Sequence, residues 1–68
     1  MSDITKDGVR VRSGQIWRDL DKRMMGRTIA VESVSEGGFA HCRTEFGRPT
    51  RIAIARMHRH STGWELVK

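Results

Sequence analysis

Apolar and polar positions alternate most clearly between residues 27 and 55. Ile29 and Val31 alternate with polar or small residues, Gly37-Gly38 interrupts the pattern, and the alternation then resumes. A period of two residues is typical of a strand with one buried face, and paired glycines favour a two-residue hairpin turn. A second connection at Gly47-Arg48-Pro49 leads into a third strand. The pattern therefore predicts a three-stranded antiparallel meander over about residues 27 to 55.

The two predicted turns fix a register. A two-residue turn sets Ile29 opposite Phe46, and a three-residue second connection sets Cys42 opposite Ile54. These four residues then face the interior, whereas Phe39 is sent to the outer face beside the first turn. On the outer face, carboxylates oppose guanidinium groups. The register therefore predicts an apolar inner face and an ion-paired outer face.

Two interpretations are open for residues 15–25. Ile16, Leu20 and Met24 fall at helical spacing, and Gly26 would end such a helix. The other interpretation is a short strand followed by a loop, since Asp-Leu-Asp-Lys is a turn-forming string. Periodicity alone does not decide between them, and both are kept.

The two ends of the chain differ in predicted order. Residues 1–8 hold one large apolar residue, Ile4, which predicts a flexible N-terminal tail. Residues 9–68 are predicted to form one small domain. Its last strand is predicted at Trp64–Val67, where Trp64 and Leu66 would point the same way.

Three strings form a recognisable frame. The chain reads GQIWRDLDKR at Gly14–Arg23, GRTI at Gly26–Ile29 and GWELV at Gly63–Val67. Over about residues 9–67 this resembles a family of small proteins of actinobacteria and their phages that share G-Q-x-W-x-D-x-D-x-R, G-R-x-I/L-x-V and G-Y/W-x-L-V. The resemblance implies a strand at Gln15–Arg18, then a loop and the meander, which together suggest a mostly β, five-stranded SH3-like barrel. It supplies no function.

Composition narrows the class of protein. A chain of 68 residues makes one domain with a limited core, so self-association is a live alternative. The single cysteine has no internal disulfide partner, and the first residues lack a secretory apolar run. No stretch approaches the roughly 18 apolar residues of a membrane span. We therefore expect a cytoplasmic protein, in a bacterium or a phage-infected host cell, with no membrane association.

The charge balance favours a polyanionic partner. Thirteen basic residues against eight acidic ones give a formal net charge of +5, which attracts DNA or RNA. The alternative is that arginine reflects genomic base composition and has no ligand. Because Arg43 and Arg51 are predicted to pair with Glu32 and Glu45, the remaining cations carry the nucleic-acid prediction. The predicted phosphate-binding residues are Arg10, Arg12, Arg48, Arg56 and Arg59.

The chain lacks motifs for catalysis. It has no nucleophile elbow, phosphate loop or dinucleotide fingerprint. Asp19 and Asp21 stand beside cations, which is more typical of a salt-bridged loop than of paired catalytic carboxylates. His58 and His60 could join His41 or Cys42 around a metal ion, but structural zinc sites have more closely spaced ligand pairs. We therefore predict a protein that is not an enzyme and holds neither cofactor nor metal.

Two functions from different classes follow. The first is a nucleic-acid-binding accessory module that contacts the phosphate backbone with little sequence preference. The second is a protein-interaction module, acting on a host factor if the chain is phage-encoded, because SH3-like barrels commonly dock peptides on loops and outer faces. Its predicted contacts are the apolar residues Phe39, Leu20 and Met25. A steep dependence of binding on salt would separate the first function from the second.

Overall fold

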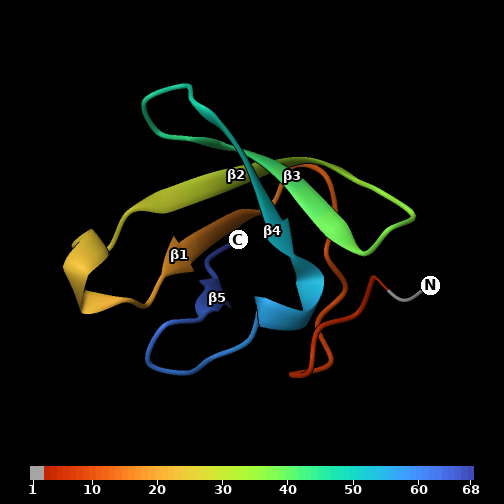
Figure 1. The fold of residues 1–68 in the computed structure, drawn as a ribbon, viewed down its shortest axis with the longest axis horizontal. Helices are drawn as coiled ribbons and strands as arrows, with labels where there is room; N and C mark the ends of the chain where they lie inside the picture. The colour runs from red at the N-terminus through yellow and green to blue at the C-terminus, as the bar shows by residue number, and fades with distance from the viewer. Residues whose placement is uncertain (1–2) are drawn as a thin grey trace.

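The computed structural model describes residues 3–68 and contains one antiparallel sheet of five strands in the order β4-β3-β2-β1-β5 (Figure 1). The prediction of a mostly β fold is confirmed. The sheet is not closed into a barrel, so the SH3-like barrel is not confirmed. The strands are β1 (Ile16–Asp19), β2 (Thr28–Val34), β3 (Phe39–Thr44), β4 (Pro49–Ala53) and β5 (Trp64–Leu66), and two 3-10 turns are η1 (Lys22–Met24) and η2 (Ile54–Arg56).

The connection between β1 and β2 decides between the two interpretations of residues 15–25. The segment is a strand followed by the single 3-10 turn η1, so the helical alternative is wrong. Met25 ends the turn with φ 54° and Gly26 follows with φ 73°. Successive residues in the left-handed region stop a helix, which explains why the helical spacing is not used. None of the helical turns in residues 3–68 is long and apolar enough to cross a membrane.

Both turns of the meander are three-residue loops. In the first, the Ser35 amide donates to the Phe39 carbonyl (2.9 Å) and Gly38 has φ 84°. The predicted two-residue turn is wrong because it needs two residues at positive φ, and Gly37 is not one of them. In the second loop, the Thr44 amide donates to Arg48 (2.8 Å), so this loop lies earlier in the chain than predicted.

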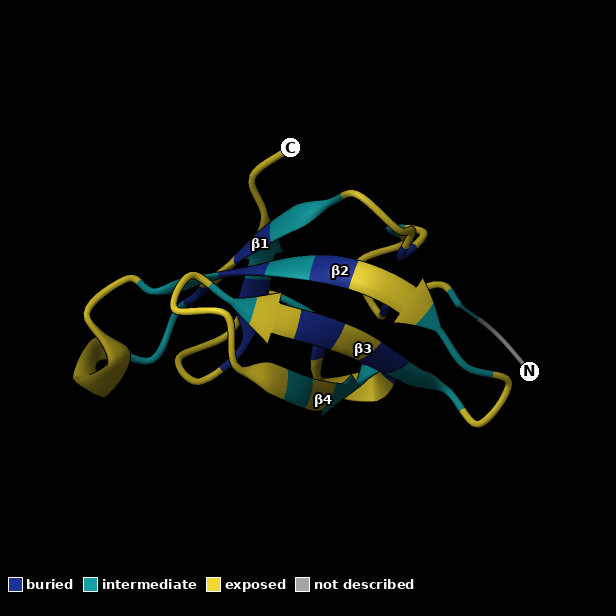
Figure 2. Ribbon diagram, turned by 90° about the horizontal axis from the view of Figure 1, so that it is seen from above, coloured by how far each residue is buried: buried dark blue, intermediate teal, exposed yellow. Residues whose placement is uncertain are grey.

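These turns shift the register without exchanging the faces of the sheet. Cys42 pairs with Thr50 rather than Ile54, a displacement of four residues, and an even displacement leaves each side chain on its own face. Between β2 and β3 the register shifts by one residue between Val31 and Ser33, where a bulge absorbs the odd step. Figure 2 shows buried and exposed positions alternating along β3.

The predicted inner face is correct in β2 and β3 and wrong at one position. Ile29, Val31, Ala40 and Cys42 are buried. Phe46 was expected opposite Ile29, but it lies in the β3–β4 loop and is 86 % exposed. The earlier loop causes this error, because β3 ends at Thr44 and leaves the aromatic ring outside the sheet. The buried hydrophobic residues of the described chain are Val11, Trp17, Ile29, Val31, Ala40, Cys42, Ile54, Met57 and Trp64.

Trp17 connects the sheet to the N-terminal segment. It is the largest fully buried side chain, and its indole N–H donates to the Gln15 side-chain oxygen (3.1 Å). The same oxygen accepts from the Arg12 amide (2.8 Å), while the Gln15 amide group donates to the Arg10 carbonyl (2.9 Å). Gln15 therefore satisfies the buried indole and holds the N-terminal segment over the core.

The N-terminal segment folds back on itself where a flexible tail is expected at residues 1–8. Ile4 and Arg10 form an isolated antiparallel bridge, and the Thr5 amide donates to the Val9 carbonyl (2.8 Å). Thr5 is 5 % exposed. Met1 and Ser2 lie outside the described residues. The segment thus covers one side of the core instead of lying apart from it.

The loop before β5 closes tightly around Gly63. The Trp64 amide donates to the His58 carbonyl (3.0 Å), and the Leu20 amide donates to the Gly63 carbonyl (2.9 Å), which ties the loop to the end of β1. A Cβ at Gly63 would collide with the His58 carbonyl oxygen and meet the His60 ring. Only a glycine fits where the chain passes so close to its own backbone.

We expect Gly63→Ala to destabilise the protein by about 1–3 kcal/mol, because the loop must open to admit the methyl group. Chemical denaturation followed by tryptophan fluorescence measures the loss. Gly37→Ala is the matched control, since its Cβ would meet the Phe39 ring at an ordinary 3.6 Å. Equal losses in the two variants would show that the steric account of Gly63 is wrong.

Candidate functional site

Half of the arginines are held in ion pairs. The Glu32–Arg43 pair was predicted and is confirmed, although the partners lie diagonally across β2 and β3 because of the shifted register. Arg51 does not oppose Glu45; its guanidinium carbon lies 4.5 Å from the centroid of the Phe39 ring. The five ion pairs within residues 3–68 are Arg10–Asp3 (3.1 Å), Arg18–Glu65 (3.2 Å), Arg23–Asp21 (2.8 Å), Arg27–Asp19 (2.9 Å) and Arg43–Glu32 (3.0 Å).

Asp19 and Asp21, in the string Gly14–Arg23, both accept hydrogen bonds that stabilise the local structure. The Asp19 carboxylate is 5 % exposed, and it accepts from the Asp21 amide (2.9 Å) and from Arg27 Nε (2.9 Å). Asp21 accepts from the side chain and the amide of Arg23, which lower the pKa of its carboxyl group. The Arg27 guanidinium also lies over the Trp64 ring, 5.6 Å from its centroid. This cluster joins the ends of β1, β2 and β5.

The predicted phosphate-binding arginines fall into separate places. The β3–β4 turn, which holds Arg48, lies at the opposite side of the molecule from η2 and the loop before β5, which hold Arg56 and Arg59 (Figure 1). Arg10 is engaged with Asp3 at 3.1 Å, and Arg12 is exposed with its backbone amide held by Gln15. The five residues therefore do not form one patch.

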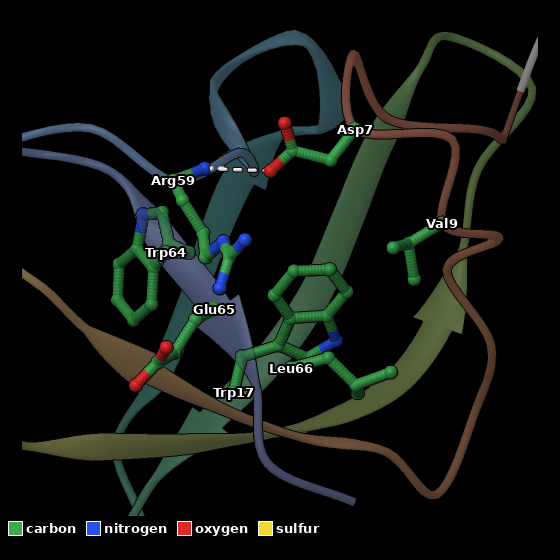
Figure 3. Close-up of a pocket in the computed structure, with 7 residues that line it drawn as sticks. All are labelled: Asp7, Val9, Trp17, Arg59, Trp64, Glu65 and Leu66. Carbon is green, nitrogen blue, oxygen red and sulfur yellow. Dashed lines mark hydrogen bonds between the residues drawn. The ribbon is translucent and has the colours of Figure 1, made fainter.

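The N-terminal segment and the loop before β5 meet, with the carboxylate of Asp7 between them. The Arg59 amide donates to Asp7 (2.8 Å), which places the N-terminal segment against the loop before β5 (Figure 3). A shallow hollow lies here, with Trp17 and Trp64 among its walls and the Arg59 side chain extending between them in the close-up. Asp7 and Glu65 also line the hollow. The charge of the hollow is therefore mixed rather than uniformly positive.

Four arginines that have no carboxylate partner among residues 3–68 lie in one stretch of the sequence. Between Glu45 and Glu65 there is no acidic residue, and this stretch contains Arg48, Arg51, Arg56 and Arg59. None of these four arginines forms an ion pair within the part of the chain that the structure describes. We call residues 46–64 the acid-free segment. Counting charges along the sequence would have found it, and would have placed Arg51 with the other unpaired arginines.

The histidines and Cys42 do not gather into one site. The rings of His58 and His60 lie 4.3 Å apart and are tilted by 38°, and His60 Nδ1 accepts from the Thr62 amide (3.3 Å). Cys42 is buried on the inner face of β3, where desolvation first and the charge of Glu32 second raise the pKa of its thiol to about 11. Within residues 3–68, no group of three or more His, Cys, Asp or Glu residues could hold a metal ion.

The predicted protein-contact residues differ in exposure. Met25 is 92 % exposed in the β1–β2 connection, whereas Leu20 is half-buried. Phe39 is half-buried on the outer face of β3, with the Arg51 guanidinium over its ring. Beside it lies a shallow, mainly apolar depression, which we call the Phe39 groove. Its lining residues are Ile4, Lys6, Gly37, Gly38, Phe39, Ala53, Ile54 and Ala55.

Comparison with known proteins finds no relative of this chain. No protein-family model, no curated protein and no solved structure matches it. The contacts and charges of the chain itself are therefore the evidence for its function.

We expect Asp19→Ala to lower the free energy of unfolding by roughly 2–3 kcal/mol, because it leaves the Asp21 amide and the Arg27 guanidinium without their acceptor. Urea denaturation measures this loss. Asp21→Ala is the control, since its partner Arg23 is largely exposed and such pairs contribute little. A loss at Asp21 as large as at Asp19 would contradict the structural role assigned to the buried carboxylate.

We expect Cys42 to resist thiol reagents in the folded protein, because the buried thiol stays protonated at pH 8 and the reactive species is the thiolate. Reaction with a chromogenic disulfide should be slow in buffer and reach one equivalent after addition of guanidinium chloride. Rapid stoichiometric labelling of the folded protein would show that β3 does not bury this residue.

Proposed function

We propose that this protein is a non-catalytic module that binds nucleic acid through the phosphate backbone. The observation that carries the proposal is the acid-free segment, whose four arginines have no carboxylate partner among residues 3–68. Such cations are available to release counterions from a polyanion on binding. Because phosphates carry no sequence information, this mode gives weak sequence preference.

The ion pairs rank the arginines within this proposal. Asp3 is ion-paired with Arg10 and would compete with phosphate for it. We therefore expect Arg10 to contribute less to binding than Arg56 and Arg59. Arg59 is held in place through its backbone by Asp7, and the turn that follows it is held by the His60 ring, which accepts from the Thr62 amide. We therefore take Arg56 and Arg59 as the principal contacts, with Arg12, Arg48 and Arg51 as secondary ones.

The strand order also bears on the architecture of the proposed module. The strand order, with β5 beside β1 and β4 at the far edge, is the order that an SH3-like barrel would have before closure, and we propose that the module belongs to that architecture. In this proposal it acts in the cytoplasm of a bacterium or of a phage-infected cell. A second function, binding to a protein, is favoured by the Phe39 groove.

The test is a fluorescence-anisotropy titration of labelled duplex and single-stranded DNA at 50 and 200 mM salt. For about four phosphate contacts we expect affinity to fall roughly 100-fold between the two salt concentrations. The Arg56→Ala/Arg59→Ala variant should bind at least tenfold more weakly at low salt, and its salt slope should fall by about two.

The matched control is Arg18→Ala/Arg43→Ala, which removes the same number of charges from arginines that are ion-paired with Glu65 and Glu32. It should bind DNA much more tightly than the first variant. No binding by the unmodified protein at low salt would refute the proposal. Equal weakening by both variants would show that net charge, and not the acid-free segment, is responsible.

A further inference from the structure

The outer edge of β4 presents unpaired backbone groups. In the ladder with β3, the Thr44 amide donates to the Arg48 carbonyl and the Ile54 amide donates to the Gly38 carbonyl. The backbone amides and carbonyls of the even-numbered residues of β4 therefore point toward β3. The odd-numbered residues then direct their backbone groups away from the sheet. No turn or loop hydrogen bond within residues 3–68 reaches the amide or carbonyl of Arg51 or the amide of Ala53.

The Phe39 groove adjoins this edge. Ala53 lies on the edge and also lines the groove, next to Phe39 and Ile4. A strand that added along β4 would place alternate side chains on the outer face of the sheet, where they would enter the groove. The backbone edge and the apolar depression therefore form one continuous surface for an extended polypeptide.

The charged residues that line the groove or belong to β4 itself are basic. Lys6 is the one charged residue that lines the groove, and Arg51 covers the Phe39 ring beside it. Arg48 precedes β4 and Arg56 ends η2, with no acidic residue between them. A second copy of the chain, paired through its own β4, would bring these cations against their equivalents. The charge favours an acidic partner and opposes self-pairing.

We propose that an acidic, extended segment of another protein docks here by adding a strand to the edge of β4. Its backbone bonds to the Arg51 amide and carbonyl and to the Ala53 amide. Its side chains on the outer face are both apolar and acidic: the apolar ones enter the Phe39 groove, and the carboxylates contact Lys6, which lines the groove, and Arg51, which lies on that same face. This site goes beyond nucleic-acid binding and does not rest on it.

One substitution isolates the backbone contribution. Ala53 has φ −66° and ψ 128°, which match the conformation of proline, and its amide points away from β3. Ala53→Pro therefore removes an edge donor while leaving the charges and the β3–β4 ladder intact. We expect its thermal stability to equal or exceed that of the unmodified protein. Amide NMR spectra confirm that the fold is retained.

The probe is a decapeptide with the repeat valine-serine-glutamate-serine, which places valine and glutamate on one face of a strand, added up to millimolar concentration and followed by amide NMR. We expect the Arg51 and Ala53 resonances to shift and their hydrogen exchange to slow. Ala53→Pro should weaken binding at least tenfold, as read from the Phe39 and Arg51 signals. The same peptide N-methylated at alternate residues keeps its charge and should also bind at least tenfold more weakly.

Three outcomes overturn the proposal. The first is no shift at Arg51 or Ala53 at millimolar peptide. The second is equal affinity of Ala53→Pro and the unmodified protein, which shows that charge alone attracts the peptide. The third is equal binding of the same decapeptide with lysine in place of each glutamate. DNA binding that persists in Ala53→Pro leaves the nucleic-acid proposal standing by itself, so the two proposals fail separately.

Discussion

Burial of the Trp17 indole beneath the N-terminal segment is the constraint on which the rest of the structure depends. A chain of 68 residues has a small core, and this one side chain is the largest that the core encloses completely. Its N–H needs an acceptor, which Gln15 supplies while also holding the backbone of Arg12 and Arg10. The N-terminal segment is fixed as a result. That position brings Asp7 to the loop of Arg59 and Lys6 to the Phe39 groove.

Much of the fold could be predicted from the sequence, because alternation records which side of a strand is buried. The inner positions of β2 and β3 were correct even though both turns were misplaced, since the register errors were even or were absorbed by the bulge after Val31. Phe46 was misplaced because hydrophobicity does not show where a strand ends. The turn conformation decides that, and it depends on which glycine takes positive φ, here Gly38 and Gly47.

The candidate site was less predictable, because ion pairing is a property of three-dimensional contacts. Adjacent charges in the opening motif indicated a salt-bridged loop, and the pair of Asp21 with Arg23 agrees with this. The partnership of Asp19 with Arg27 joins the end of β1 to the residue before β2, and no local pattern indicated it. Arg10 was predicted to bind phosphate because no cross-strand carboxylate was expected opposite it, whereas its partner Asp3 lies in the segment expected to be a flexible tail. The open edge of β4 could not be inferred before the strand order was known.

The close fit around Gly63 also bears on the binding proposed for the basic loop. Residues 58–63 are held by the Trp64 and Gly63 amides at one end and by Asp7 at the Arg59 backbone. A loop held in this way loses little conformational entropy when its side chains contact a partner, because the backbone was ordered during folding. The arginine side chains keep their own rotamer freedom and adjust to the spacing of the ligand's charges. The loop thus combines a preorganised backbone with adaptable side chains, a combination that would suit the proposed anionic partner by allowing fast association.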